Sequence, residues 1–296
     1  MKVIPPQLRA LWIACCRRWF GEAVIRMPVP PHDIGLSVGL HMVVSSKTWK
    51  MGLMALRSLE FQTGARWSPV IHEDGSLSDA DAEELAILQP DATLIRRRDA
   101  DALVSEGLAS WPVCRENRAR HNWFIKFFDT FLLARHPHYI VLDSDIVFYR
   151  APRFLQDWAE RGADTLHFMR DTRETYASPR ADLEAAMGFP FWESVNSGIC
   201  LMFKPAVSLD LAEQFLTRCA AGARHYKFLE QTLFALTGSA WNRGGCLPPE
   251  YEISWGNFRS RSAVCRHYVG PFKDDLLWVE GAASFWLDQK LRRRRT

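Results

Sequence analysis

The most constraining feature of this chain is a short apolar run that ends in two acids. Tyr139-Ile-Val-Leu142 is continuously apolar, as in a central parallel strand covered on both faces, and Asp143-Ser-Asp145 follows it directly. In an extended chain these carboxylates project to the same side, at the strand end where open α/β sheets bind ligands. Because partly buried carboxylates repel each other, a hard divalent cation such as Mn²⁺ or Mg²⁺ would stabilise them. The run therefore predicts a metal site in an α/β protein, and a solvated turn after a strand is the alternative.

Patterns typical of strands and helices alternate around this run. Strands are predicted at 40–45, 68–72, 165–169 and 195–203, and helices at 50–62, 79–88, 122–135, 209–220 and 228–236. This order predicts a Rossmann-like α/β fold with a mixed, mostly parallel central sheet flanked by helices. The prolines at 28, 30 and 31 separate an N-terminal basic segment, 1–35, from a catalytic domain, 36–280, and a C-terminal helix with a basic tail follows at 281–296.

Composition excludes several classes of protein. The chain has 296 residues, 48% of them apolar, which suffices for one large domain with a sizeable core. A net charge of +3 is too small for a typical nucleic-acid-binding protein. Seven cysteines without regular spacing argue against a disulfide framework, so we expect reduced thiols in a cytoplasmic protein.

Basic residues gather at both ends of the chain. The stretch 8–28 mixes Leu, Trp, Ile and Phe with arginines, and it lacks the uninterrupted apolar region of a signal peptide. Two interpretations stay open: an amphipathic helix on an anionic membrane surface, or a helix packed on its own domain. In the first interpretation, the basic ends of the protein would make peripheral contact with the inner membrane face.

The segment Tyr139-Ile-Val-Leu-Asp-Ser-Asp-Ile-Val-Phe148 resembles the metal-binding strand of GT-A glycosyltransferases. It is most similar to the retaining family 8 group, which includes glycogenin and bacterial lipopolysaccharide galactosyl- and glucosyltransferases. Three later segments resemble that family's motifs and follow in the same order: Val195-Asn-Ser-Gly-Ile-Cys-Leu-Met202, Glu230-Gln231 and His267-Tyr-Val-Gly-Pro-Phe-Lys273. In the family these are a strand beside the donor sugar, an Asp-Gln pair near the anomeric carbon, and an element that contributes a metal ligand and a diphosphate-binding lysine.

The resemblance implies a role for each matching residue. The metal ligands would be Asp143, Asp145 and His267, and the residues near the reacting sugar would be Asn196, Glu230 and Gln231. Asp143 and Lys273 would also contact the donor. This chain departs from the family in two places: Glu230 is longer than the usual Asp, and Lys273 precedes two acids that compete for its ammonium group.

Three further donor-binding candidates come from other patterns. Lys126 lies on the polar side of the predicted helix before the metal strand, where the family has a basic residue; an ion pair with Asp129 is the alternative. Glu73-Asp-Gly-Ser76 resembles the turn of family 2 glycosyltransferases that contacts the nucleotide, which makes Asp74 a candidate and places Ser45 in the same pocket. An ordinary turn explains this tetrapeptide equally well.

Together these observations predict a hexosyltransferase-like, metal-dependent enzyme. It would move a sugar from a nucleotide-sugar, with UDP favoured, to a glycan or glycolipid acceptor with retention of configuration. An inverting enzyme would need a carboxylate base, for which Glu193 or Glu230 is the candidate. A nucleotidyltransferase is a rival, although Ser45-Ser-Lys-Thr-Trp49 lacks the glycines of a phosphate loop. A sugar-binding protein without turnover is the other.

Overall fold

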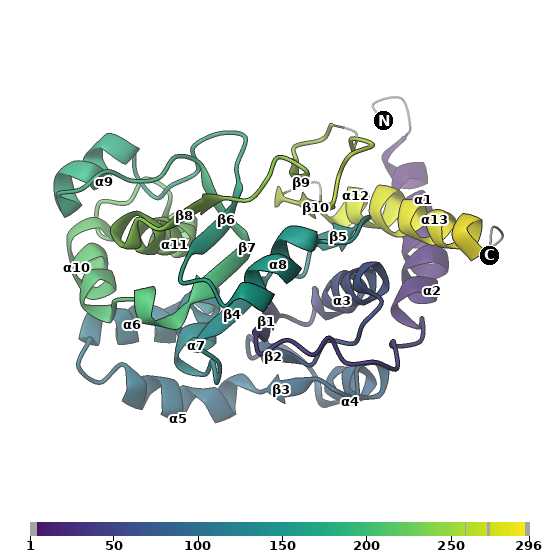
Figure 1. The fold of residues 1–296 in the computed structure, drawn as a ribbon, viewed down its shortest axis with the longest axis horizontal. Helices are drawn as coiled ribbons and strands as arrows, with labels where there is room; N and C mark the ends of the chain where they lie inside the picture. Colours follow the sequence, from purple (N-terminus) through teal and green to yellow (C-terminus); the bar gives the residue numbers. More distant parts are fainter. Residues whose placement is uncertain (1–4, 258, 271–272, 294–296) are drawn as a thin grey trace.

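Two β-sheets organise the computed structural model, which describes residues 5–257, 259–270 and 273–293 (Figure 1). The larger sheet has the strand order β3-β2-β1-β4-β7-β6-β8, and the smaller has the order β5-β10-β9. The strands are β1 Gly39–Val44, β2 Pro69–Glu73, β3 Thr93–Ile95, β4 His138–Leu142, β5 Ile146–Phe148, β6 Leu166–Arg170, β7 Val195–Phe203, β8 Gly244–Cys246, β9 Tyr251–Ser254 and β10 Cys265–Tyr268.

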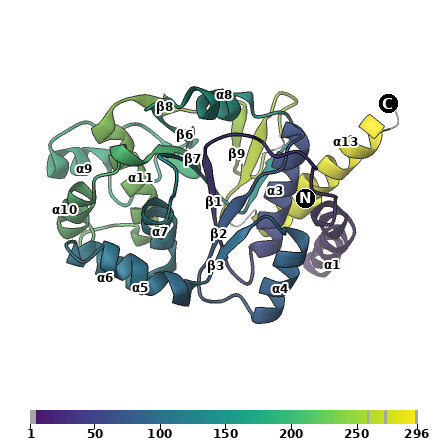
Figure 2. The same ribbon diagram turned by 60° about the horizontal axis from the view of Figure 1, so that its bottom comes forward.

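Helices cover both faces of the larger sheet, with α3 and α4 on one face and α7, α10 and α11 on the other (Figure 2). Their bounds are α1 Pro6–Cys16, α2 Glu22–Ile25, α3 Trp49–Thr63, α4 Asp79–Leu88, α5 Arg97–Gly107, α6 Pro112–Arg120, α7 Ile125–Leu132, α8 Arg153–Arg161, α9 Arg180–Met187, α10 Leu209–Cys219, α11 Leu229–Trp241, α12 Lys273–Leu276 and α13 Ala283–Arg293. Two π-helical segments, Arg17–Gly21 and Leu277–Ala282, continue α1 and α12. The predicted α/β class is confirmed.

The apolar run of β4 is buried on both faces, as its composition predicts. Ile140 and Leu142 belong to the core beneath α3, whereas Tyr139 and Val141 belong to the core beneath α7 and α11. Alternate residues of a strand point to opposite faces, so a strand covered on both sides needs apolar residues at every position. This burial fixes the place where the two following acids emerge.

Strand β7 runs antiparallel to both of its neighbours, β4 and β6, whereas the other pairs in the larger sheet are parallel. Its first residues therefore lie beside the carboxyl ends of β4 and β6, where Met169 pairs with Asn196. The sheet is mixed for this reason, and one edge collects the ends of β1, β2, β4 and β6 together with the start of β7.

The predicted helix at 122–135 is in fact two elements. A 3-10 turn, Asn122–Phe124, precedes α7, and the polar side of α7 is buried: Lys126, Asp129 and Thr130 are all inaccessible or nearly so. Buried charges require partners. The helix therefore contributes charged groups to the interior and not to a solvated face.

The two ends of the chain pack side by side at one end of the molecule (Figures 1 and 2). Phe20 contacts Trp286 of α13, and Gly21 lies against the indole of Trp278, so closely that a Cβ there would come within 2.6 Å of the ring. Val24 and Ile25 are buried in the same core as β1. Much of the N-terminal segment is thus packed on its own domain, one of the two alternatives predicted for it. Every helix in the described ranges is too short or too polar to cross a bilayer.

Candidate metal centre and donor site

The predicted metal ligands lie at the junction between the two sheets. Asp143 follows β4 of the larger sheet, and its backbone N–H donates to the carbonyl of Gly198 on β7 at 2.8 Å. Asp145 precedes β5 of the smaller sheet, and its carbonyl accepts from the N–H of Tyr268 at 2.9 Å. His267 on β10 pairs with Ile146 across the smaller sheet. Residues 124 positions apart in the chain therefore meet because β5 and β10 are neighbours.

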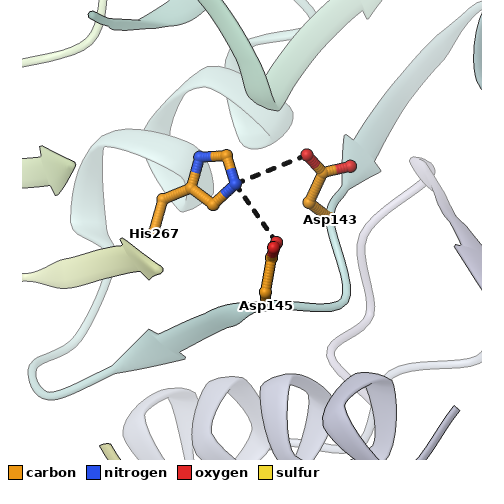
Figure 3. A group of neighbouring side chains, drawn as sticks. All are labelled: Asp143, Asp145 and His267. Carbon is orange, nitrogen blue, oxygen red and sulfur yellow. Dashed lines mark ion pairs between the residues drawn. The ribbon is translucent and has the colours of Figure 1, made fainter. Parts of the chain in front are cut away.

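The three side chains converge on a common point (Figure 3). The Nε2 atom of His267 lies 3.1 Å from a carboxylate oxygen of Asp145 and 3.6 Å from one of Asp143. One ligand atom from each residue lies within 4.8 Å of the other two. Two carboxylates and an imidazole at this spacing form a ligand set suited to Mn²⁺ or Mg²⁺, and His is the ligand that favours Mn²⁺ of the two.

Neighbouring groups fix the orientation of the His267 ring. Its Nδ1 lies 3.0 Å from Oδ1 of Asn196, and the same oxygen accepts from the N–H of Gly198 at 3.0 Å. Because that amide oxygen carries no proton, Nδ1 must be the donor, which leaves Nε2 facing the acids. Gly198 is required by close approach: a Cβ there would lie 2.3 Å from Nδ1. A hydrogen-bonded Nδ1 and an Nε2 directed at carboxylates form the usual arrangement of a metal-binding histidine.

Opposite charges decide the protonation of the two buried partners. Burial raises the pKa of Asp145, but the nearby His267 and two lysines outweigh it, so the net shift is downward. Burial lowers the pKa of His267, but Asp145 and Asp143 outweigh it and the net shift is upward. Both shifts favour the charged forms, an imidazolium beside carboxylates, and a bound cation would supply the same positive charge.

Lys126 of α7 pairs with a metal-ligand candidate, Asp143, and not with Asp129, the alternative partner. Its Nζ lies 2.7 Å from Asp143, 3.4 Å from Glu230 and 3.0 Å from the Ser197 hydroxyl. The carboxylate of Asp129, one helical turn away, instead accepts two hydrogen bonds from Arg118. An ion pair between Lys126 and Asp129 is therefore the wrong interpretation of this helix.

Glu230 lies in the first turn of α11 and is buried against β7. Burial raises its pKa to about 7, a shift that Lys126 opposes and Asp143 increases. Its Oε1 accepts no hydrogen bond from the described residues, although Lys126 is nearby. The Glu230 carboxyl group therefore has its pKa near neutral pH and lies beside the metal-ligand candidates.

Gln231 is held in a network of side-chain amides. Its Nε2 donates to the carbonyl and hydroxyl of Thr175 at 2.8 and 2.7 Å, so its Oε1 faces Asn196 Nδ2 at 3.3 Å. The centre of this network is Asp171, which accepts from Asn196, Thr175 and the indole of Trp255. Asp171 was not among the predicted site residues, although it follows the strand predicted at 165–169, at the sheet edge that binds ligands.

The remaining donor-binding candidates lie in two places. Lys273 Nζ is 3.8 Å from Asp145, while the competing acid Asp275 pairs with Arg9. The predicted motif also contains residues 271 and 272, which lie outside the described residues. Asp74 accepts from Asn122 Nδ2 at 3.3 Å and from the Ser76 backbone.

Ser45 forms the turn after β1, where its hydroxyl lies 3.1 Å from that of Thr48. The next residue, Ser46, donates its N–H to the Ser76 hydroxyl, so the turns after β1 and β2 are in contact. Glu193, in contrast, is 70% exposed and pairs with Arg180. Trp192 packs on Phe168 and against Gly238.

Comparison by sequence finds neither a protein-family model nor a curated protein that matches this chain. Comparison with solved structures finds glycosyltransferases. Mouse xyloside xylosyltransferase 1 in its apo form has a TM-score of 0.52 and 14% identity, over 78% of this chain and 97% of that one. The galactosyltransferase LgtC, solved with donor and acceptor sugar analogues, has a TM-score of 0.55 and 14% identity, over 85% of this chain and 95% of that one.

The bifunctional glycosyltransferase WbbM, in its apo form, has a TM-score of 0.53 and 13% identity, over 89% of this chain and 52% of that one. The structural neighbours thus include family 8 enzymes, the group that the motifs resemble, and other GT-A enzymes. At these identities the likeness establishes the fold, and this chain has the GT-A fold.

Proposed function

We propose that this protein is a metal-dependent glycosyltransferase that transfers a sugar from a nucleotide-sugar, with UDP-sugars favoured, to a glycan or glycolipid. The observation that carries the proposal is the convergence of Asp143, Asp145 and His267 at the sheet edge of a GT-A fold. Residues 36–280 would form the catalytic unit, and seven free thiols support a cytoplasmic site of action.

The chemistry of the ligand set supports Mn²⁺ or Mg²⁺ as the cofactor. Two acids and a histidine whose Nε2 faces them satisfy its preference, and any proton held on that Nε2 would be lost on binding. When bound, the ion neutralises the donor diphosphate and makes it a better leaving group.

Cationic side chains on two sides would complete the diphosphate site. Lys126 is buried with Asp143 and Glu230, and Lys273 approaches Asp145 from the opposite end of the chain. Each supplies a fixed positive charge to the phosphate oxygens in the transition state. Asp74 and Ser45, in the contacting turns after β2 and β1, would bind the nucleoside.

Side-chain amides would hold the sugar. Asn196 positions the His267 ring, and Gln231, hydrogen-bonded to it, would face the anomeric carbon and stabilise the sugar cation. Glu230, with a pKa near 7, would accept or donate hydrogen bonds to sugar hydroxyls. Retention is favoured by the resemblance of the motifs, and by the fact that Glu193 is an exposed, paired side chain.

The proposal is tested with purified protein, Mn²⁺ and a panel of UDP-, GDP- and CMP-sugars, with nucleotide release followed by mass spectrometry. We expect metal-dependent release from at least one donor, abolished by a chelator and by Asp145→Ala. Asp157→Ala, which removes an acid of α8 whose side chain is 58% exposed, is the matched control. No release and no metal-dependent binding with any donor would contradict the proposal and leave a sugar-binding protein. Pyrophosphate release from nucleoside triphosphates would instead indicate a nucleotidyltransferase.

A further inference from the structure

The N-terminal helix has a second apolar side that nothing in the described structure covers. Ile13, Cys16 and Phe20 face the domain, whereas Leu8, Leu11, Trp12 and Trp19 are all more than half exposed, with Trp19 at 72%. The spacing of the exposed set, i, i+3, i+4 and i+11, places its members along one stripe of a helix. Most large apolar residues exposed elsewhere are single, so this stripe is a continuous surface.

The positive charge of the chain is concentrated at its two ends in the sequence. Residues 1–26 contain five basic residues and one acid, and residues 281–296 contain the same numbers. Because the whole chain has a net charge of +3, the remaining residues carry a net charge of −5. The two basic ends meet through Phe20 and Trp286, and Arg17 and Arg18 are exposed within the turn that carries Trp19.

We infer that this surface docks the protein on an anionic lipid bilayer, with the exposed stripe inserted among the headgroups and the basic ends held by lipid charge. A helix with an exposed Leu and Trp stripe and flanking arginines is suited to lie in the plane of the interface. Tryptophan combines an apolar ring with an N–H donor and therefore favours the headgroup level. The inference does not depend on the proposed catalytic function.

Charge also selects between the occupants of this surface. A second copy of the chain would bring two strongly basic ends together, and their repulsion opposes association. An anionic bilayer has the complementary charge and attracts such residues by about 1 kcal/mol each, which is about a fivefold change in binding.

The test is sedimentation of the whole protein with phosphatidylcholine vesicles, with and without phosphatidylglycerol, at low and high salt. We expect binding to the anionic vesicles alone, weakened by salt. The double variant Trp12→Ser/Trp19→Ser should bind at least about tenfold more weakly, since it loses the inserted rings. Arg18→Gln should weaken binding about fivefold.

Ile87→Ser/Leu103→Ser is the matched control, because it removes two exposed apolar residues of α4 and α5 and should leave vesicle binding unchanged. Thermal unfolding of each variant establishes that it is folded. Equal binding by the tryptophan variant and the wild type would overturn the inference, as would equal binding to neutral and anionic vesicles. If the wild-type protein is a dimer in light scattering, and the tryptophan variant loses the dimer but keeps its vesicle binding, the surface belongs to a second copy instead.

Discussion

Helix α7 contributes to two buried charge clusters that have opposite characters. Lys126 lies between Asp143 and Glu230, and one turn later Asp129 lies against Arg118. In the second cluster the guanidinium binds both carboxylate oxygens at 2.9 and 2.6 Å, so donors and acceptors are matched. In the first, the Glu230 Oε1 accepts no hydrogen bond from any residue that the structure describes, and the Asp143 side chain is 27% exposed.

This difference indicates that the Arg118–Asp129 cluster stabilises the fold, whereas the Lys126 cluster belongs to the candidate site. In the closed cluster Arg118 donates to Asp101 as well as to Asp129, so its guanidinium has carboxylate partners and leaves no acceptor for a ligand. The open cluster faces two further metal-ligand candidates and has one acceptor, Glu230 Oε1, that no described residue uses. Burial and charge alone, which are similar in the two clusters, do not distinguish them; the state of the hydrogen bonds does.

The largest effect is expected from Arg118→Met, which breaks the closed cluster. Removal of one partner of a buried ion pair leaves the other charge uncompensated and destabilises the fold by about 3–5 kcal/mol. Urea unfolding should report this loss, while nucleotide release per folded molecule stays at the wild-type value. A stable but inactive Arg118→Met protein would contradict the assignment of Arg118 to the fold and place it in the site instead.

In the open cluster, Lys126→Met should act mainly on turnover. Loss of a fixed positive charge at the diphosphate should reduce nucleotide release about 100-fold or more. The loss of stability should be smaller than for Arg118→Met, because Glu230, with a pKa of about 7, can take up a proton when its cation is lost. If instead the variant unfolded readily and the folded fraction were fully active, Lys126 would belong to the scaffold.

A third buried cluster shows burial without opposite charge. His41 and His72 lie in adjacent strands with their ring nitrogens 2.9 Å apart. Burial lowers the pKa of His41 to about 4, and burial, with His41 and Arg118 nearby, lowers that of His72 well below its usual value. Above the unfolded-state pKa of about 6.5 both states are neutral, and below it the unfolded state binds more protons.

The free energy of unfolding should therefore have its full value above pH 6.5 and fall as the pH decreases towards 4. At pH 5 the loss from His41 alone is about 2 kcal/mol. Urea unfolding between pH 4.5 and 7.5 measures it, and His41→Asn should flatten the curve. A stability that rises as the pH falls through this window would contradict the expected sign.

A smaller effect is expected from Gly198→Ala, which displaces the His267 ring by steric overlap with its Nδ1. Metal affinity, measured by titration calorimetry with Mn²⁺, should fall about tenfold or more, as for other groups that orient a metal ligand. Gly222→Ala, where a Cβ meets no atom within 4 Å, is the matched control. An unchanged affinity would mean that His267 is not a ligand.

The smallest effect is expected from Glu193→Gln. Its exposed ion pair with Arg180 contributes little to stability, and nucleotide transfer should change less than about twofold. A loss of 100-fold or more would instead identify Glu193 as the catalytic base of an inverting enzyme.

Elements with local patterns were predictable from the sequence. The helix Asp79–Leu88 and the strand Val195–Phe203 have the predicted bounds, because the N-cap Ser78 begins the helix and the apolar run 199–203 specifies most of the strand. Strand β10 was not predicted as a strand: Arg266 and His267 are both buried there, and a polar pair has no strand pattern. Its burial depends on β5, β9 and Glu280 of the π-helical segment, and β5 lies more than 100 residues away in the chain.

The same limit applies to the site. The positions of Asp143 and Asp145 follow from one strand, whereas the partner of Lys126 depends on which carboxylate reaches it in three dimensions. Helical spacing favours Asp129, and the fold instead provides Arg118 for that acid. Asp171 was missed because a single acid after a strand is common, and only its contacts with Asn196 and Thr175 distinguish it.

The tripeptide Asp143-Ser-Asp145 connects β4 directly to β5. Its two acids therefore flank strands of different sheets. An ion bound by both acids and by His267 would cross-link those sheets. Metal affinity and the rigidity of the junction are then thermodynamically coupled, so that each strengthens the other. Amide hydrogens of β5 and β10 should exchange more slowly with Mn²⁺ present, whereas those of β2 and β3, far from the junction, should not respond.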